Sequence, residues 1–266
     1  MINTLDREAL KQQFESNRPY PHFVIENFLD PAAAQEIAAA YPDFKRAAQM
    51  GLEFKAVNEQ RKVQICDQSK FPEPVRRLSE LISGKPFLSD LEYITGIPNL
   101  LADPKFSGGG MHVTGPGGRL DVHVDFNYQK EEKLHRRLNI LLYLNPQWRP
   151  EWGGEIEMWD KDVKNRLTSM SPLLNRCLVF ETTEISYHGV RPVTVPDDVC
   201  RRSFAAYYYT AEAPAHWKGE SHSTIFKARP EERLRGMLLM PAEQVKRRMQ
   251  AVLRATKNHV KKALGI

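Results

Sequence analysis

The 266-residue sequence has only three cysteines, and no two of them form a C-x-x-C pair. This scarcity argues against a disulfide framework and a thiolate zinc site, so buried apolar thiols are expected. The chain also has no run of eighteen apolar residues, and its first stretch, MINTLDREALKQQFE, has no apolar signal region. We therefore expect neither a transmembrane segment nor secretion, and predict a cytoplasmic protein.

The net charge of +5 is unevenly distributed. Residues 242–266 hold seven basic residues and one acidic residue, so the rest of the chain is close to neutral. Apolar residues recur in this segment at roughly helical intervals, which predicts a basic amphipathic helix. It could pack on the body as an extra helix, lie on an anionic membrane surface, or contact a polyanion such as RNA or a saccharide polymer.

The N-terminal part predicts helices and one strand. Residues 5–15 have helical spacing, and residues 21–29 alternate well enough for a strand. Asp30, which stands before a proline, is typical of a helix start. Residues 72–96 read as two short helices with a break at Gly84.

From Phe106 the sequence becomes rich in short β-like stretches, separated by clusters of Gly, Pro, Asn and Asp. Many brief strands with such turns predict an antiparallel sandwich or barrel of the jelly-roll type. We expect one catalytic unit in three parts: a helical and strand support at 1–105, a β core at 106–212, and a helical basic extension at 213–266.

The stretch DVHVDFN, residues 121–127, places His123 and Asp125 two positions apart in a predicted strand. Side chains at i and i+2 of a strand point to the same face, so the imidazole and the carboxylate converge. His188, in ISYHGVRPV, is a candidate third ligand. Two histidines and one carboxylate, with coordination positions left open, form the facial triad of non-haem Fe(II) oxygenases. H-x-D alone is a weak signal, because a surface strand with a solvent-exposed polar face has the same sequence pattern.

A second pair of residues strengthens this interpretation. Arg201 and Ser203 also stand at i and i+2, at the start of the predicted strand RRSFAAYYYT. A guanidinium beside a hydroxyl can bind the terminal carboxylate of a dicarboxylic acid, whereas Arg202 should face the opposite way.

With these residues the sequence resembles the Fe(II)/2-oxoglutarate-dependent dioxygenase superfamily, in its prolyl-4-hydroxylase-like branch. The resemblance covers roughly residues 20–210. The motifs that carry it are HVD at 123–125, HGV at 188–190, the R-x-S of Arg201 and Ser203, GPGG at 115–118, RLNILLYLNPQW followed by WGGEIEMW, and the entry segment PHFVIENFLDPAAAQEIAAAYP. Thr114 and Gly115 depart from the pattern, since many relatives have a tyrosine there.

The resemblance implies a double-stranded β-helix with N-terminal helices packed on the sheet. It implies Fe(II) held by His123, Asp125 and His188, with 2-oxoglutarate and O₂ as co-substrates and ascorbate as reductant. Arg201 would bind the far carboxylate of 2-oxoglutarate, and Tyr143 stands where prolyl hydroxylases place a hydroxyl on the same group. An ordinary sheet aromatic is an equal alternative for Tyr143. The implied reaction hydroxylates a C–H bond while 2-oxoglutarate becomes succinate and CO₂.

Two other functions stay open: a non-catalytic β-barrel binding module, and a cupin-like metalloenzyme that does not use 2-oxoglutarate. The substrate could be a small molecule or a peptidyl residue, because specificity lies in flanking loops. We read His112 as a sheet histidine and His135 as part of a solvated loop. Residues 222–236, HSTIFKARPEERLRG, receive no chemical role.

Overall fold

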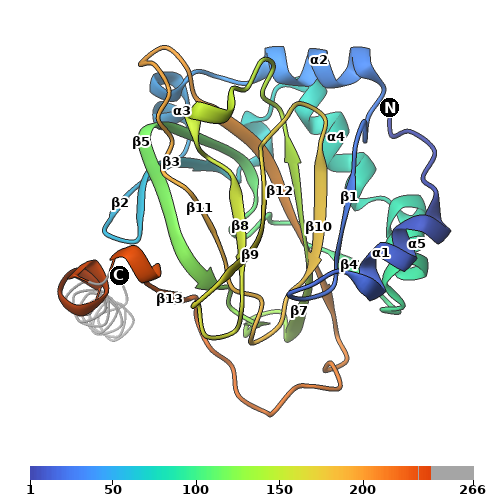
Figure 1. The fold of residues 1–266 in the computed structure, drawn as a ribbon. Helices are drawn as coiled ribbons and strands as arrows, with labels where there is room; N and C mark the ends of the chain where they lie inside the picture. Colours follow the sequence, from blue (N-terminus) through green and yellow to red (C-terminus); the bar gives the residue numbers. More distant parts are fainter. Residues whose placement is uncertain (233, 241–266) are drawn as a thin grey trace, which may run out of the picture.

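The computed structural model describes residues 1–232 and 234–240 (Figure 1). Five α-helices lie in the N-terminal part of the described chain, with one strand between the first two. They are α1 (Arg7–Ser16), α2 (Pro31–Ala40), α3 (Phe44–Met50), α4 (Glu73–Ser83) and α5 (Lys85–Thr95), and the strand is β1 (His22–Ile25). The predicted break at Gly84 is confirmed, because this residue ends α4 and precedes α5.

Short polar side chains fix where the first helices begin. The carboxylates of Asp6, Asp30 and Asp43 accept hydrogen bonds from backbone N–H groups in the first turns of α1, α2 and α3. Each of these N-caps satisfies donors that have no partner inside the helix. The predicted helix start at Asp30 is therefore confirmed.

One curled antiparallel sheet contains the strands of the described chain. Its continuous order is β1-β10-β7-β12-β5-β11-β8-β9, with β3 and β13 paired to β5, β2 to β3, β4 to β12 and β6 to β7. The remaining bounds are β2 (Leu52–Ala56), β3 (Glu59–Ile65), β4 (Leu101–Ala102), β5 (Gly110–Val124), β6 (Tyr128–Gln129), β7 (Leu134–Tyr143), β8 (Ile156–Trp159), β9 (Arg166–Met170), β10 (Cys177–Glu181), β11 (His188–Val190), β12 (Arg201–Thr210) and β13 (Ile225–Lys227).

The long strand β5 gives the sheet its curl. Its first half pairs with β12, from Gly110 to Thr114, whereas its second half pairs with β11, from Leu120 to His123. One strand thus belongs to both walls of a half-barrel, as in a jelly roll. The predicted jelly-roll fold is confirmed.

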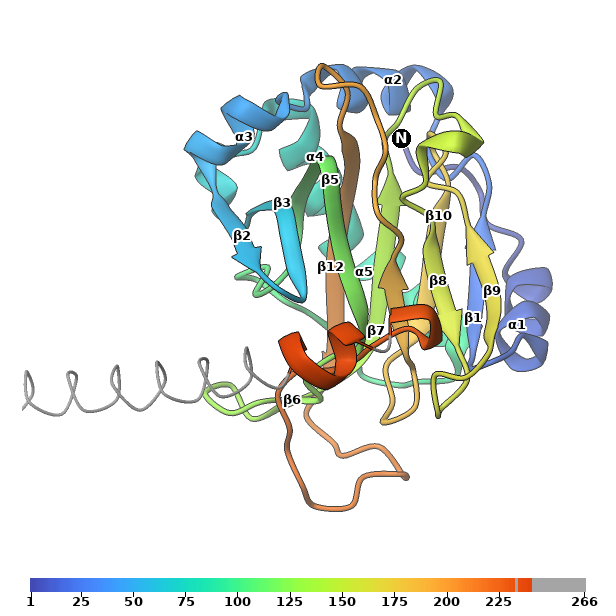
Figure 2. The same ribbon diagram turned by 60° about the vertical axis from the view of Figure 1, so that its left-hand side comes forward.

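The helices cover one face of the sheet, and the other face encloses the barrel interior (Figures 1 and 2). Strand β12 shows the division: Phe204 and Tyr208 belong to the main core under the helices, whereas Tyr207 and Tyr209 belong to a separate cluster on the opposite face. Because strand side chains alternate, one strand can supply both a packed core and a cavity wall. Phe204 contacts two further phenylalanine rings edge to face in the core.

Some predictions fall outside or beyond these elements. The predicted amphipathic helix at 242–266 lies outside the described residues. The two boundaries predicted between support, core and extension stay predictions, although β13, which follows residue 212, pairs with β5. Among the helices that the structure describes, none combines the length and apolar character needed to cross a bilayer.

Candidate metal centre

Two neighbouring strands bring the three candidate ligands together. His123 and Asp125 lie at the end of β5, and His188 begins β11, directly opposite His123 in the sheet register. One donor atom from each residue lies within 4.8 Å of the other two. His123 Nε2 is 3.6 Å from Asp125 Oδ1, and His188 Nε2 is 3.5 Å from Asp125 Oδ2. Three donors at such spacing can share one cation.

Backbone carbonyls set the tautomer of both imidazoles. His123 Nδ1 lies 2.9 Å from the carbonyl oxygen of Asp121, and His188 Nδ1 lies 2.9 Å from that of Ser186. A carbonyl oxygen only accepts, so the proton resides on Nδ1 and the lone pair on Nε2 faces the centre. Burial lowers the pKa of His188 to about 4, with His123 as a second cause. The imidazole of His188 is therefore neutral near pH 7, as a metal ligand must be.

Asp125 is held in place by two side chains of β7. Asn139 donates to Asp125 Oδ2 at 2.8 Å, and Arg136 forms an ion pair with the same oxygen at 3.1 Å. Burial alone would raise the pKa of Asp125, but Arg136 and the two imidazoles hold this pKa well below its ordinary value. The carboxylate is therefore ionised. Two imidazole nitrogens and one anionic oxygen are a donor set that suits Fe(II).

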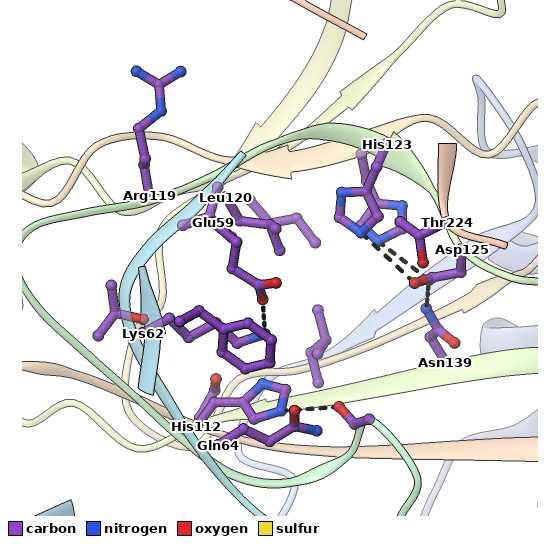
Figure 3. Close-up of a pocket in the computed structure, with 18 of the residues that line it drawn as sticks. Glu59, Lys62, Gln64, His112, Arg119, Leu120, His123, Asp125, Asn139 and Thr224 are labelled. Carbon is purple, nitrogen blue, oxygen red and sulfur yellow. Dashed lines mark hydrogen bonds and ion pairs between the residues drawn. The ribbon is translucent and has the colours of Figure 1, made fainter. Parts of the chain in front are cut away.

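The three donors line a cavity of about 310 Å³ that also contains the predicted Arg201 and Ser203. Figure 3 shows His123, Asp125, Asn139 and Thr224 on one side of this cavity. Among the described residues, four lysine and arginine side chains line this cavity, and three of them have carboxylate partners. These pairs are Lys62–Glu59 at 2.8 Å, Arg119–Asp121 at 2.6 Å and Arg136–Asp125 at 3.1 Å.

Arg201 differs from these three cations. Its Nε donates to the carbonyl oxygen of Gly154 at 2.7 Å, and Nη1 lies 3.4 Å from the Ser203 hydroxyl. Within residues 1–232 and 234–240, no carboxylate lies at ion-pair distance from Arg201, although its side chain is buried. A buried cation is costly without an anionic partner. The arrangement fits an anionic ligand that occupies the cavity.

Tyr143 lies beside Arg201 but does not itself line the cavity. The guanidinium carbon of Arg201 is 5.1 Å from the centre of the Tyr143 ring. The Tyr143 hydroxyl is buried and interacts with the Arg201 guanidinium beside it. Burial raises its pKa to about 12, so the hydroxyl stays protonated and can donate.

Comparison with known proteins agrees with this site. Residues 109–209 match the sequence model of the 2OG-Fe(II) oxygenase superfamily, and this segment contains His123, Asp125, His188 and Arg201. These residues belong to the 2OG-Fe(II) oxygenase superfamily. The resemblance predicted from the sequence is confirmed.

The similar proteins include several prolyl hydroxylases. Prolyl 3-hydroxylase OGFOD1 of Mus musculus is 31% identical over 83 residues, which are 30% of this chain and 15% of the mouse protein. The match thus covers only a small part of that relative. A prolyl-4-hydroxylase from Pseudomonas putida superimposes with a TM-score of 0.54 at 14% identity, covering 77% of this chain and 98% of that one.

A second solved structure shows the same fold. It is a prolyl hydroxylase from Trichoplax adhaerens, in complex with a peptide fragment of the hypoxia inducible factor oxygen degradation domain. The superposition has a TM-score of 0.54 at 20% identity and covers 76% of this chain and 88% of that one. At such identities the likeness establishes the 2OG oxygenase fold and nothing further about this chain.

The cavity also contains side chains that were not among the residues predicted from the sequence. A charged pair, Glu59 and Lys62, faces the cavity from β3, on the side opposite the metal centre (Figure 3). In a regular strand these two residues would face opposite ways, since they are three positions apart. The strand is irregular between Gln60 and Lys62, and Arg61 has a φ of +47°. This bulge re-aims one member of the pair, as bulges near active sites often do.

The sequence also predicted the surroundings of two histidines, His112 and His135. His112 is a buried sheet residue, as expected, and it also lines the cavity. The expectation of a solvated His135 is wrong, because His135 is buried in β7 and its ring lies edge to face with Trp217, 4.6 Å away. The charged residues around His135 obscure the strand pattern in the sequence. The strand β7 pairs with β12, which lies far along the chain.

Proposed function

We propose that this protein is an Fe(II)- and 2-oxoglutarate-dependent oxygenase. In this proposal His123, Asp125 and His188 hold the iron, and Arg201 binds the far carboxylate of 2-oxoglutarate, assisted by Ser203 and Tyr143. The observation that carries it is the pairing, in one cavity, of the three clustered donors with a buried guanidinium that has no carboxylate partner among the described residues.

The chain's own residues would perform placement and charge control. The carbonyls that hold each Nδ1 proton direct both Nε2 lone pairs inwards, and Asn139 with Arg136 keeps Asp125 ionised and oriented. Bound Fe(II) would supply the oxygen chemistry that couples decarboxylation of 2-oxoglutarate to hydroxylation of a C–H bond. Related halogenases lack the carboxylate that Asp125 provides, so its presence supports hydroxylation.

For the substrate we propose peptidyl proline as the first class to test and a small molecule as the second. The first rests on the names of the relatives, which are prolyl hydroxylases, one of them in complex with a peptide.

We also propose ascorbate as the reductant. A cytoplasmic location stays a prediction, as does contact between the basic segment 242–266 and an anionic surface or polyanion; cell fractionation and binding to heparin test these two.

The direct test measures succinate after the protein is mixed with Fe(II), 2-oxoglutarate and ascorbate under air, with a panel of proline-containing peptides. We expect succinate from the wild type and from Asp197→Ala, which removes an exposed carboxylate. Asp125→Ala should form essentially none. A peptide that is a substrate should gain one oxygen, detectable by mass spectrometry. Equal succinate from Asp125→Ala and the wild type would refute the proposed iron site.

A further inference from the structure

Strand β13 continues the outer edge of β5 where β3 ends. β3 pairs with β5 as far as Leu120, and β13 pairs with residues 122–124. His123 therefore has a cross-strand neighbour on each side: His188 in β11 and Phe226 in β13. β13 lies outside the segment 109–209 that matches the superfamily, so this neighbour belongs to the flanking part of the chain.

The sheet register, and not only a rotamer, makes Phe226 face the cavity. Directly opposed residues in an antiparallel pair point to the same face, so Phe226, His123 and His188 form one row. The ring centroids of Phe226 and His123 are 5.4 Å apart, with an angle of 36° between the ring planes. Thr224 lies two positions earlier, on the same face, and lines the cavity beside Asp125 (Figure 3).

Contacts on both sides of β13 fix its position. Arg229, two residues after the strand, is buried and donates to Glu157 Oε2 at 2.7 Å. Before the strand, the His222 backbone N–H donates to Asn127 Oδ1 at 3.0 Å, and His222 Nε2 lies 2.6 Å from Glu184 Oε2. A three-residue strand is marginal alone, so these anchors determine where it lies.

The connection before β13 is also attached to the barrel. It leaves the sheet at the end where β6 lies (Figure 2), and Trp217 packs there against Tyr128 of β6 and against His135. Residues 217–229 are thus held at several points, so β13 has a fixed position in the wall of the cavity.

The wall beside the metal centre is largely apolar. In the next row of the sheet, Val190 lies opposite Leu120, and both line the cavity together with Phe226. The charged pair Glu59 and Lys62 lies on the opposite side and is mutually satisfied at 2.8 Å. A charged group next to the metal would therefore lose its favourable hydration without gaining a partner from this wall. A compact saturated group is only weakly hydrated, so its transfer to this wall costs little.

We propose that β13 is the substrate-side wall of the metal pocket, with Phe226 as a specificity-determining residue that admits a compact uncharged group and excludes water. This inference rests on the proposed oxygenase function. A closed active site excludes water and so suppresses side reactions. Loss of the Phe226 ring would remove part of this closure, so the metal centre should become more accessible to solvent.

The experiment compares Phe226→Ala with Ile225→Ala, a matched control in the same strand whose side chain is exposed. The first readout is the relaxation of water protons by Mn(II) in the protein bound to 2-oxoglutarate. We expect a clear increase for Phe226→Ala and none for the control, while both variants bind Mn(II) within about twofold of the wild type. The second readout is succinate formed without any added substrate, which should rise severalfold only in Phe226→Ala.

Unchanged relaxation and unchanged substrate-free succinate in Phe226→Ala would overturn the proposal. Loss of Mn(II) binding would also overturn it, because Phe226 would then support the centre and not the wall. Should the alanine variant not fold, Phe226→Leu keeps the test available, with smaller changes in the same direction. Failure of the proposed oxygenase function is recognised separately, since the wild type itself would then form no succinate.

Discussion

Replacing Arg201 with methionine tests the anchor for 2-oxoglutarate. The guanidinium is buried, and no carboxylate of the described chain pairs with it, so its charge is available to a ligand. Truncating one partner of a buried, hydrogen-bonded charge pair costs about 2–5 kcal/mol. At about 1.36 kcal/mol per factor of ten, the affinity for 2-oxoglutarate should fall roughly 30- to 5,000-fold. Arg201→Lys should recover only part of this loss, since lysine lacks the planar fork.

The assay is calorimetric titration of the Mn(II)-loaded protein with two oxo acids. 2-Oxovalerate has the same chain length as 2-oxoglutarate but no far carboxylate, so its weaker binding should not change in Arg201→Met. Arg202→Met is the matched control, because Arg202 faces away from the cavity and donates to the carbonyl oxygen of Ala38. A change below threefold for 2-oxoglutarate, or an equal loss for both acids, would refute the assigned role of Arg201.

Three further variants test how the surroundings support the site. Asn139→Ala removes the donor to Asp125, and Mn(II) affinity should fall about 10- to 100-fold, measured by titration; no change would contradict the supporting role. Burial and nearby cations lower the pKa of His112 well below its ordinary value, so the unfolded protein binds the extra proton and stability falls as pH drops below about 6.5. His112→Gln should show a smaller loss of unfolding free energy between about pH 7.5 and 5.5 in urea, and an unchanged loss would contradict this. Arg229→Met leaves Glu157 with one buried partner fewer, and thermal or urea unfolding should show a loss of about 3 kcal/mol, whereas a stable variant would argue against anchoring by Arg229.

The side-chain period of a strand allowed much of the site to be predicted. His123 and Asp125 were expected on one face, as were Arg201 and Ser203, and the structure places all four in the cavity lining. The jelly-roll class followed from short β-rich stretches with turns between them. These features depend on local sequence, where alternation and turn residues are informative.

The remaining contacts depend on how distant strands align. Asn139 of β7 reaches Asp125 because both β7 and β5 pair with β12, and a sequence pattern does not contain such an alignment. The irregularity at Arg61 changes which side chains of β3 face the cavity, so Glu59 and Lys62 lie on the same face. Phe226 stands in a stretch whose charged neighbours hid a short strand, and its role depends on pairing with a partner about a hundred residues earlier.

Anaerobic titration with Fe(II) and then 2-oxoglutarate is the most direct measurement of the central claim. If one ferrous ion is held by the histidines and the aspartate while 2-oxoglutarate chelates it, a visible metal-to-ligand charge-transfer band should grow to one equivalent and be absent from His188→Ala. A wild-type protein that binds both components yet shows no such band would contradict the account.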